Sequence, residues 1–132
     1  MTKILFVAFS HSLTEDQVSD AKLSLGVEKV VTLQEVDPVL QKEFSQVPAQ
    51  ASTEDIFYLA AKVVDRAIKA GASHFYVAGE PGVVVRASIL AKLADIKVVQ
   101  STTARDSVEE IQEDGTVKKT AVFKHVQWRS VF

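Results

Sequence analysis

Three short polar segments in this sequence carry side chains that could hold or act on a phosphate group. The first, Ser10-His11-Ser12, sets an imidazole between two hydroxyls, and an imidazole exchanges a proton near neutral pH. The second, Gly79-Glu80-Pro81-Gly82, has two glycines that let a ligand approach backbone N–H groups closely. The third, Ser101-Thr102-Thr103 followed by Arg105, combines hydroxyls with a planar guanidinium that suits phosphate. Together they predict a binding site for a phosphate-bearing ligand.

Each segment also has an ordinary structural interpretation. His11 can be a surface residue before a helix cap, and 79–82 can be the strand-to-helix turn of any α/β fold. That turn lacks the third glycine of a dinucleotide-binding fingerprint and the Gly-Lys-Ser/Thr of a P-loop, so neither a nicotinamide dinucleotide site nor an ATPase site is predicted. Arg105 can be an exposed side chain of a simple loop, and Arg86 is more typical of a solvated helix residue.

The three segments follow apolar runs of strand length, and predicted helices separate those runs. Residues 4–9 are apolar throughout, as in a strand buried on both faces, and are expected to form the central strand. Further strands are predicted at 30–33, 75–78 and 96–99, with helices at 14–25, 37–44, 52–70 and 83–94. This alternation predicts a parallel sheet with right-handed crossovers and helices on both faces. Because parallel strands share one carboxyl edge, the three segments should converge there.

Local patterns indicate the ends and the buried faces of the predicted helices. Thr14 forms a capping box with Gln17, three residues later, and Gly26 fits a helix stop. The helix at 52–70 has one apolar stripe, which comprises Ile56, Leu59, Ala60, Val63, Val64 and Ala67. The helix at 83–94 is expected to pack through Val84, Ile89, Leu90 and Leu93.

The pattern changes after Ser101, and the end of the chain predicts an antiparallel hairpin over about residues 105–128. Segments 108–112 and 117–126 flank Asp114-Gly115, a dipeptide favoured in two-residue turns whose central positions need positive φ. Opposite charges are expected to face each other across the strands, with Glu109, Glu110 and Glu113 against Lys118, Lys119 and Lys124. His125 lies among aromatic residues, which should pack onto the sheet or onto a second subunit.

Composition suggests a globular domain in a reducing cytoplasm. The 132 residues suit one domain, 1–132, with a single core. A net charge of -2 argues against generic binding to long nucleic acid, which needs a basic surplus. The sequence has no cysteine for disulfides or thiolate metal sites, and no apolar stretch approaches the roughly 20 residues that span a bilayer. The three histidines show no metal-ligand spacing, so catalysis is expected to need no metal and no cofactor.

Motifs near both ends of the chain resemble those of a known family. At the C-terminus they are Thr102-Thr103-Ala104-Arg105, Glu109-Glu110, Asp114-Gly115 and the run Val122-Phe123-Lys124-His125-Val126-Gln127-Trp128-Arg129. At the N-terminus they are Phe9-Ser10-His11, Leu13-Thr14 and Gln17. The chain resembles the small stand-alone ring nucleases associated with type III CRISPR systems, which are related to the CRISPR-associated Rossmann fold (CARF) sensor domains. This chain has Gln127 where that family usually has a basic residue.

The resemblance implies a Rossmann-like domain that binds a cyclic oligoadenylate second messenger, expected to be cyclic tetra-adenylate, and cleaves it to end antiviral signalling. In such enzymes a ribose 2′-hydroxyl of the ligand is the nucleophile, and the products carry a 2′,3′-cyclic phosphate. His11 would act as catalytic acid or base, and Arg105 would stabilise the developing negative charge. Ser10, Ser12, Gly79, Glu80, Gly82, Thr102 and Thr103 would hold the ligand. The rotational symmetry of the ring predicts a two-fold homodimer.

Two other functions fit the same residues. One is a module that binds and sequesters cyclic oligoadenylate without cutting it. The other is a sugar-phosphate or nucleotide enzyme of general Rossmann-like type, against which only the C-terminal motifs argue.

Overall fold

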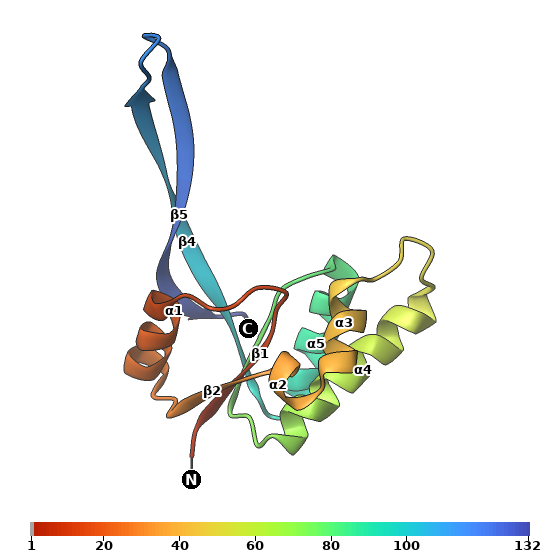
Figure 1. Ribbon diagram of the computed structural model, residues 1–132. Helices are drawn as coiled ribbons and strands as arrows, with labels where there is room; N and C mark the ends of the chain where they lie inside the picture. The colour runs from red at the N-terminus through yellow and green to blue at the C-terminus, as the bar shows by residue number, and fades with distance from the viewer. Residues whose placement is uncertain (1) are drawn as a thin grey trace.

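The computed structural model describes residues 2–132, and its strands form one five-stranded sheet (Figure 1). The strands are β1 (Ile4–Ala8), β2 (Lys29–Thr32), β3 (His74–Val77), β4 (Lys97–Ile111) and β5 (Val117–Ser130), in the order β2-β1-β3-β4-β5. The first four run parallel, and β5 runs antiparallel to β4. This confirms the predicted Rossmann-like α/β fold with a C-terminal hairpin. The first strand was expected to be the central one. β1 lies between β2 and β3, and β3 is the middle strand of the five.

One face of the sheet is covered by four helices. They are α2 (Leu33–Val36), α3 (Pro38–Ser45), α4 (Thr53–Lys69) and α5 (Pro81–Leu93). The rings of Phe6 on β1 and Phe75 on β3 stack with their centroids 6.2 Å apart and are fully buried beneath these helices. The predicted stripe of α4 is confirmed, because Leu59, Ala60, Val63, Val64 and Ala67 are buried and Ile56 packs against them. The larger of two apolar clusters therefore lies on this face.

The opposite face is covered by α1 (Glu15–Asp20) and the π-helical turn η1 (Ala21–Leu25) that continues it (Figure 1). Thr14 and Gln17 form the predicted capping box, and Gly26 ends the helix with φ of 71°. A smaller apolar cluster of Leu5, Val7, Ala21, Val27, Val99 and Trp128 packs here. Helices on both faces are thus confirmed. No helix within residues 2–132 is long and apolar enough to cross a membrane.

Two predictions differ from the structure, one about the end of a strand and one about the buried face of a helix. Leu33 was expected at the end of a strand but begins α2, because Thr32 caps this short helix in a capping box with Glu35. The predicted stripe of α5 is confirmed at Val84 and Leu90 but wrong at Ile89 and Leu93, which are exposed. The buried residues of α5 are Val83, Ala87, Ser88 and Ala91, while Val84 and Leu90 are partly buried against the core. Three of the four buried side chains are small enough for α5 to lie close to α4 and the sheet.

The fourth strand was expected to end at residue 99, but β4 runs without interruption from Lys97 to Ile111. Pairing with β5 runs from Val99 to Ile111, with a register shift between Thr102 and Thr103. We call residues 103–125 the arm. Figure 1 shows that the arm projects from the body as a two-stranded ribbon, beyond the ends of the other strands. Thr102, Thr103 and Arg105 therefore lie on a strand and not in a ligand-facing loop.

The tip of the arm contains a three-residue turn, and the predicted two-residue turn was wrong. The N–H of Gln112 donates to the carbonyl of Thr116 at 2.8 Å, and the N–H of Gly115 donates to the carbonyl of Gln112 at 2.9 Å. Gly115 has φ of 84°, whereas Asp95 is the one non-glycine residue with positive φ among residues 2–132. Asp114 therefore keeps a negative φ, as in a turn closed by a glycine bulge. The predicted facing of charges holds for Glu109, whose carboxylate lies 3.7 Å from the Lys119 ammonium.

Candidate functional site

A cavity of about 490 Å³ opens at the carboxyl ends of β1 and β2. Ser10, His11 and Ser12 line it from the loop that follows β1, as predicted for a ligand at this edge of the sheet. The opposite wall is polar. It consists of Thr32 at the end of β2, Gln34 on α2, and Gln41, Lys42 and Ser45 on α3. The apolar part of the lining comes from Val7, Phe9, Leu13, Val18 and Val30. The cavity can thus receive a ligand with both polar and apolar groups.

Contacts with α3 hold the loop that carries His11. Gln41 is buried, and its side-chain amide donates to the carbonyl of Phe9 at 3.2 Å and to the hydroxyl of Ser45 at 2.8 Å. Ser10 donates in turn to the Ser45 hydroxyl at 3.1 Å. The His11 ring meets the Phe9 ring edge-on, with centroids 5.2 Å apart, and is exposed to solvent. The imidazole is therefore accessible to a ligand, and its backbone is tied to α3.

Lys42 is the cation that lines this cavity together with His11. It lies on α3, one residue after the buried Gln41, and its side chain is exposed. An ammonium at this position attracts a phosphate as a flexible point charge. Lys42, Gln41 and Ser45 were not predicted as site residues. Their neighbourhood in sequence offered no motif, and only the packing of α3 beside the β1 loop brings them to His11.

A larger cavity of about 650 Å³ lies between α3 and α4, beside the loop at 46–51. It includes none of the predicted site residues and does not lie at the carboxyl edge of the sheet. Lys42 and Glu43 line it from α3, and Tyr58 and Lys62 line it from α4. A large volume does not by itself indicate a reaction or a ligand. The smaller cavity is the better candidate site, because it contains His11 between two serines.

The segment 79–82 after β3 forms the start of α5, and Glu80 occupies the place where an anion would bind. The Glu80 carboxylate accepts from the N–H groups of Gly82 and Val83 at 3.0 and 2.9 Å. A negative charge at a helix N-terminus is stabilised by these donors and by the helix dipole. Gly79 is needed for a different reason, since a Cβ there would lie 3.0 Å from the Phe44 ring. Both glycines thus have structural roles, and the Gly82 N–H is already bonded.

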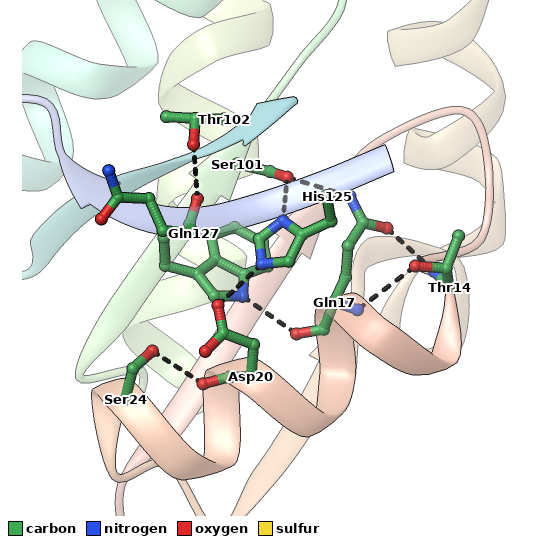
Figure 2. A network of polar contacts seen from close by, with 9 residues as sticks. Thr14, Gln17, Asp20, Ser24, Ser101, Thr102, His125 and Gln127 are labelled. Atoms are coloured by element: carbon green, nitrogen blue, oxygen red, sulfur yellow. Dashed lines mark hydrogen bonds and ion pairs between the residues drawn. The ribbon is translucent and has the colours of Figure 1, made fainter. Parts of the chain in front are cut away.

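A second group of polar residues meets on the α1 side of the sheet (Figure 2). It lies at the root of the arm, where residues 101–103 of β4 pair with residues 125–128 of β5. His125 Nδ1 lies 2.6 Å from Ser101 Oγ, and His125 Nε2 lies 2.7 Å from Asp20 Oδ2. The Gln17 side-chain amide donates to Ser101 Oγ at 3.2 Å, and the Trp128 indole N–H donates to the Gln17 carbonyl at 2.9 Å. These contacts join α1, β4 and β5 into one network.

One arrangement of protons satisfies every contact of this network. Gln17 donates to Ser101, the Ser101 hydroxyl donates to His125 Nδ1, and His125 Nε2–H donates to Asp20. The order serine, histidine, aspartate is the order of a catalytic triad. The His125 side chain is only 5% exposed, however, and the cavity at His11 does not include it. The network therefore serves to attach the arm to α1.

An aromatic row connects the cavity with the root of the arm. Phe9, which lines the cavity, meets Tyr76 on β3 edge-on with centroids 5.7 Å apart, and Tyr76 meets Trp128 edge-on at 5.2 Å. The Trp128 ring lies 5.5 Å from the His125 ring. Burial raises the pKa of the Tyr76 hydroxyl, which keeps this side chain neutral. The row packs the β1 loop and the arm against the same side of the sheet.

The remaining predicted residues are not brought to His11 within one chain. Arg105 is exposed on the arm and lies six residues beyond Val99, which is roughly 20 Å along an extended strand. Its guanidinium lies 5.9 Å from the Phe123 ring of the facing strand. Thr102 donates to the carbonyl of Gln127 at 3.2 Å, and Thr103 pairs with His125. The structure thus divides the predicted site between the cavity and the arm.

Comparison with known proteins shows which family shares this architecture. The model of the "Uncharacterized protein MJ1673 family" matches residues 3–129, which is nearly the whole chain. The chain belongs to this family. It is similar to "Uncharacterized protein MJ1673" of Methanocaldococcus jannaschii, with 26% identity over 125 residues, 95% of this chain and 94% of the relative. No solved structure matches. These descriptions state no activity, so the resemblance to ring nucleases rests on the sequence motifs alone.

Proposed function

We propose that this protein is a cytoplasmic ring nuclease that binds and cleaves a cyclic oligoadenylate, with cyclic tetra-adenylate as the expected ligand, as a homodimer. The observation that carries the proposal is the cavity at the carboxyl ends of β1 and β2, which exposes His11 between Ser10 and Ser12. The motifs shared with ring nucleases associated with type III CRISPR systems supply the identity of the ligand. The cavity supplies a place for it with an accessible acid-base group.

The volume of the cavity supports a shared ligand. About 490 Å³ falls in the range of roughly 300–1,000 Å³ that small-molecule sites occupy. This space suits part of a ring of four nucleotides but not the whole ring. A two-fold homodimer would present the same loop to each half of a symmetric ring. The proposed dimer therefore follows from the size of the ligand as well as from its symmetry.

The proposed cleavage reaction requires a base and a positive charge from this chain. The ligand 2′-oxygen forms a bond to the adjacent phosphorus, the bond from phosphorus to the 5′-oxygen breaks, and His11 takes the 2′-hydroxyl proton. Water protonates the departing 5′-oxygen, and His11 returns its proton to solvent. Lys42 is placed to stabilise the negative charge on the phosphate oxygens, while Ser10 and Ser12 orient them.

One observation favours the alternative in which the protein sequesters the same ligand without cutting it. Arg105, the expected stabiliser of negative charge, lies on the arm and does not line the cavity of its own chain. The N-terminus of α5 is already occupied by Glu80. A single chain therefore lines the cavity with one lysine, Lys42, and no arginine, which suffices for binding more readily than for catalysis.

The deciding experiment incubates the protein with radiolabelled cyclic tetra-adenylate in EDTA and separates the products by chromatography. We expect linear di-adenylate with a 2′,3′-cyclic phosphate, and we expect His11→Ala to lower the cleavage rate by about 10²-fold or more with binding retained. Ser19→Ala on the exposed side of α1 is the control and should cleave at the parental rate. Binding without conversion would support sequestration, and no binding would refute the assignment of the ligand.

A further inference from the structure

The arm exposes large apolar side chains on both of its strands. Phe123 and Ile111 are 68% and 79% exposed, and Val108, Val117 and Val122 are also exposed. The arm is also long, since Ile111 lies roughly 40 Å beyond Val99 at about 3.3 Å per residue. A two-stranded ribbon by itself is marginally stable in water, and its free edges invite pairing with another chain. The arm thus has the properties of a surface that a partner covers.

The root of the arm is attached to the body by several contacts. His125 bonds to Asp20 and Ser101, and the Trp128 indole bonds to the Gln17 carbonyl (Figure 2). Trp128 also belongs to the smaller apolar cluster. These contacts hold the first residues of the ribbon against α1 and set the direction in which the arm leaves the sheet. A ribbon that is fixed at its root and exposed beyond it is suited to contact another molecule.

Charge is distributed unequally between the two strands of the arm. On β4 the acidic residues outnumber the single Arg105, and they are Asp106, Glu109 and Glu110. On β5 the charged residues are the lysines 118, 119 and 124. Residues that face each other share one side of the ribbon, and the pairs on one side are Thr103–His125, Arg105–Phe123, Ser107–Ala121, Glu109–Lys119 and Ile111–Val117. On this side of the ribbon the acidic Glu109 of β4 lies beside the basic Lys119 of β5, and the apolar Ile111 and Val117 lie beyond them toward the tip.

We infer that the arms of two copies of this chain pack on each other, with β4 of one copy against β5 of the other. In this arrangement Glu109 faces Lys119 of the partner subunit, and Ile111 faces Val117 of the partner subunit. Packing β5 against β5 would instead place lysines against lysines, which is unfavourable. The partner that fits the arm is thus a second copy.

This interface deepens the proposed function, because it rests on the homodimer and names the surface that forms it. It also assigns Phe123, Ile111 and Val117, the exposed apolar residues on this side of the arm, a role that cleavage chemistry does not require. The two mixed-charge strands make the contact specific, since opposite charges meet only when β4 lies beside β5 of the second copy.

The first test measures the mass of the wild-type protein by sedimentation across micromolar concentrations. We expect a dimer, and we expect the double variant Phe123→Ser, Ile111→Ser to weaken dimerisation by about tenfold or more. Val85→Ser is the matched control, because Val85 is similarly exposed but lies on α5. All three side chains lie outside the two apolar clusters, so the body should stay folded, as circular dichroism would verify. A wild-type monomer, or a dimer that the double variant leaves unchanged, overturns the proposal.

The second test separates contacts between chains from contacts within one chain. Glu109→Lys and Lys119→Glu each place like charges opposite one another, both within an arm and between arms, so each variant alone should dimerise less. Mixing the two variants restores opposite charges only between chains. Native mass spectrometry should then show mixed dimers in excess of either homodimer. A statistical mixture would overturn the pairing of β4 with β5 of the second copy.

Ligand binding on the same samples separates this inference from the proposed function. Binding of cyclic tetra-adenylate is measured with the wild type and with the arm variants by calorimetry. A wild-type monomer that binds the ligand overturns the arm interface and leaves the ligand assignment standing. A dimer held by the arm that does not bind the ligand supports the interface and overturns the ligand assignment.

Discussion

His125 on β5 and Asp20 at the end of α1 are 105 residues apart in the sequence, yet His125 Nε2 lies 2.7 Å from Asp20 Oδ2 (Figure 2). The other ring nitrogen lies 2.6 Å from Ser101 Oγ. Both nitrogens of a nearly buried imidazole are therefore bonded, and each bond crosses from one element to another. This single side chain holds the root of the arm to the helix that follows the His11 loop.

Replacing Asp20 with alanine should destabilise the protein. The buried Nε2–H of His125 would lose its acceptor, and an unsatisfied buried donor costs about 1–3 kcal/mol of unfolding free energy. Asp20→Asn should cost less, because its amide oxygen can still accept that hydrogen bond. Urea denaturation followed by Trp128 fluorescence measures both, with Glu113→Ala at the exposed tip of the arm as the control. Equal stability of Asp20→Ala and the control would contradict the anchoring role of this bond.

Replacing Glu80 with alanine should weaken the start of α5. The Gly82 and Val83 N–H groups would lose their acceptor, and loss of a helix N-cap costs about 0.5–2 kcal/mol. The same change exposes these donors to an anion at the helix N-terminus. Thermal unfolding should therefore show a lower Tm without phosphate and a larger stabilisation by added phosphate than in the wild type. Glu28→Ala is the control, and an equal response in both variants would argue against the capping role of Glu80.

Replacing Gly79 with alanine should strain the core around Phe44. The added Cβ would lie 3.0 Å from the Phe44 ring, and overpacking of this kind typically costs about 1–3 kcal/mol. Phe44→Leu alone removes part of a buried ring and should also destabilise. The double variant Gly79→Ala, Phe44→Leu should be more stable than the sum of the two single losses predicts, because the smaller side chain relieves the contact. Strict additivity in a double-mutant cycle would show that the two sites are independent.

Acidification should destabilise the protein partly through His74. Burial lowers the pKa of this imidazole below its ordinary value of 6.5, and the positive charges of Lys97 and Lys3 lower it further. The unfolded chain therefore binds this proton more readily than the folded chain, so stability is full above about pH 6.5 and is lost as the pH falls through the folded pKa. His74→Gln should give a shallower loss of unfolding free energy between pH 7 and pH 5, over roughly the range that histidine titrates. Parallel curves for the variant and the wild type would rule out this contribution.

The features that were predicted correctly depend on residues close together in sequence. The capping box of Thr14 and Gln17 needs only a spacing of three residues, and the stripe of α4 needs only the period of a helix. The four parallel strands also follow from short apolar runs between helices. On α5 apolar residues occur on more than one face of the helix, so the pattern did not predict the buried face correctly. Contact with α4 decides which face is buried.

The candidate site could be predicted only in part. The loop at Ser10, His11 and Ser12 was found because polar residues at the end of a buried strand mark the ligand edge of a parallel sheet. Lys42 and Gln41 were missed, since no spacing in the sequence links α3 to that loop. Arg105 was predicted at the site because it follows the fourth predicted strand, at the ligand edge of the sheet, whereas pairing with β5 extends β4 through it.

The sequence by itself determined the α/β class, the polar loop after β1 and the hairpin at the end of the chain, because these follow from local periodicity, capping and turn residues. Only the tertiary structure decided that α3 forms the second wall of the cavity, that Glu80 fills the start of α5, and that His125 meets Asp20. The physical reason is that such contacts join residues whose separation in sequence carries no pattern. They form when packing of the two apolar clusters brings their elements together.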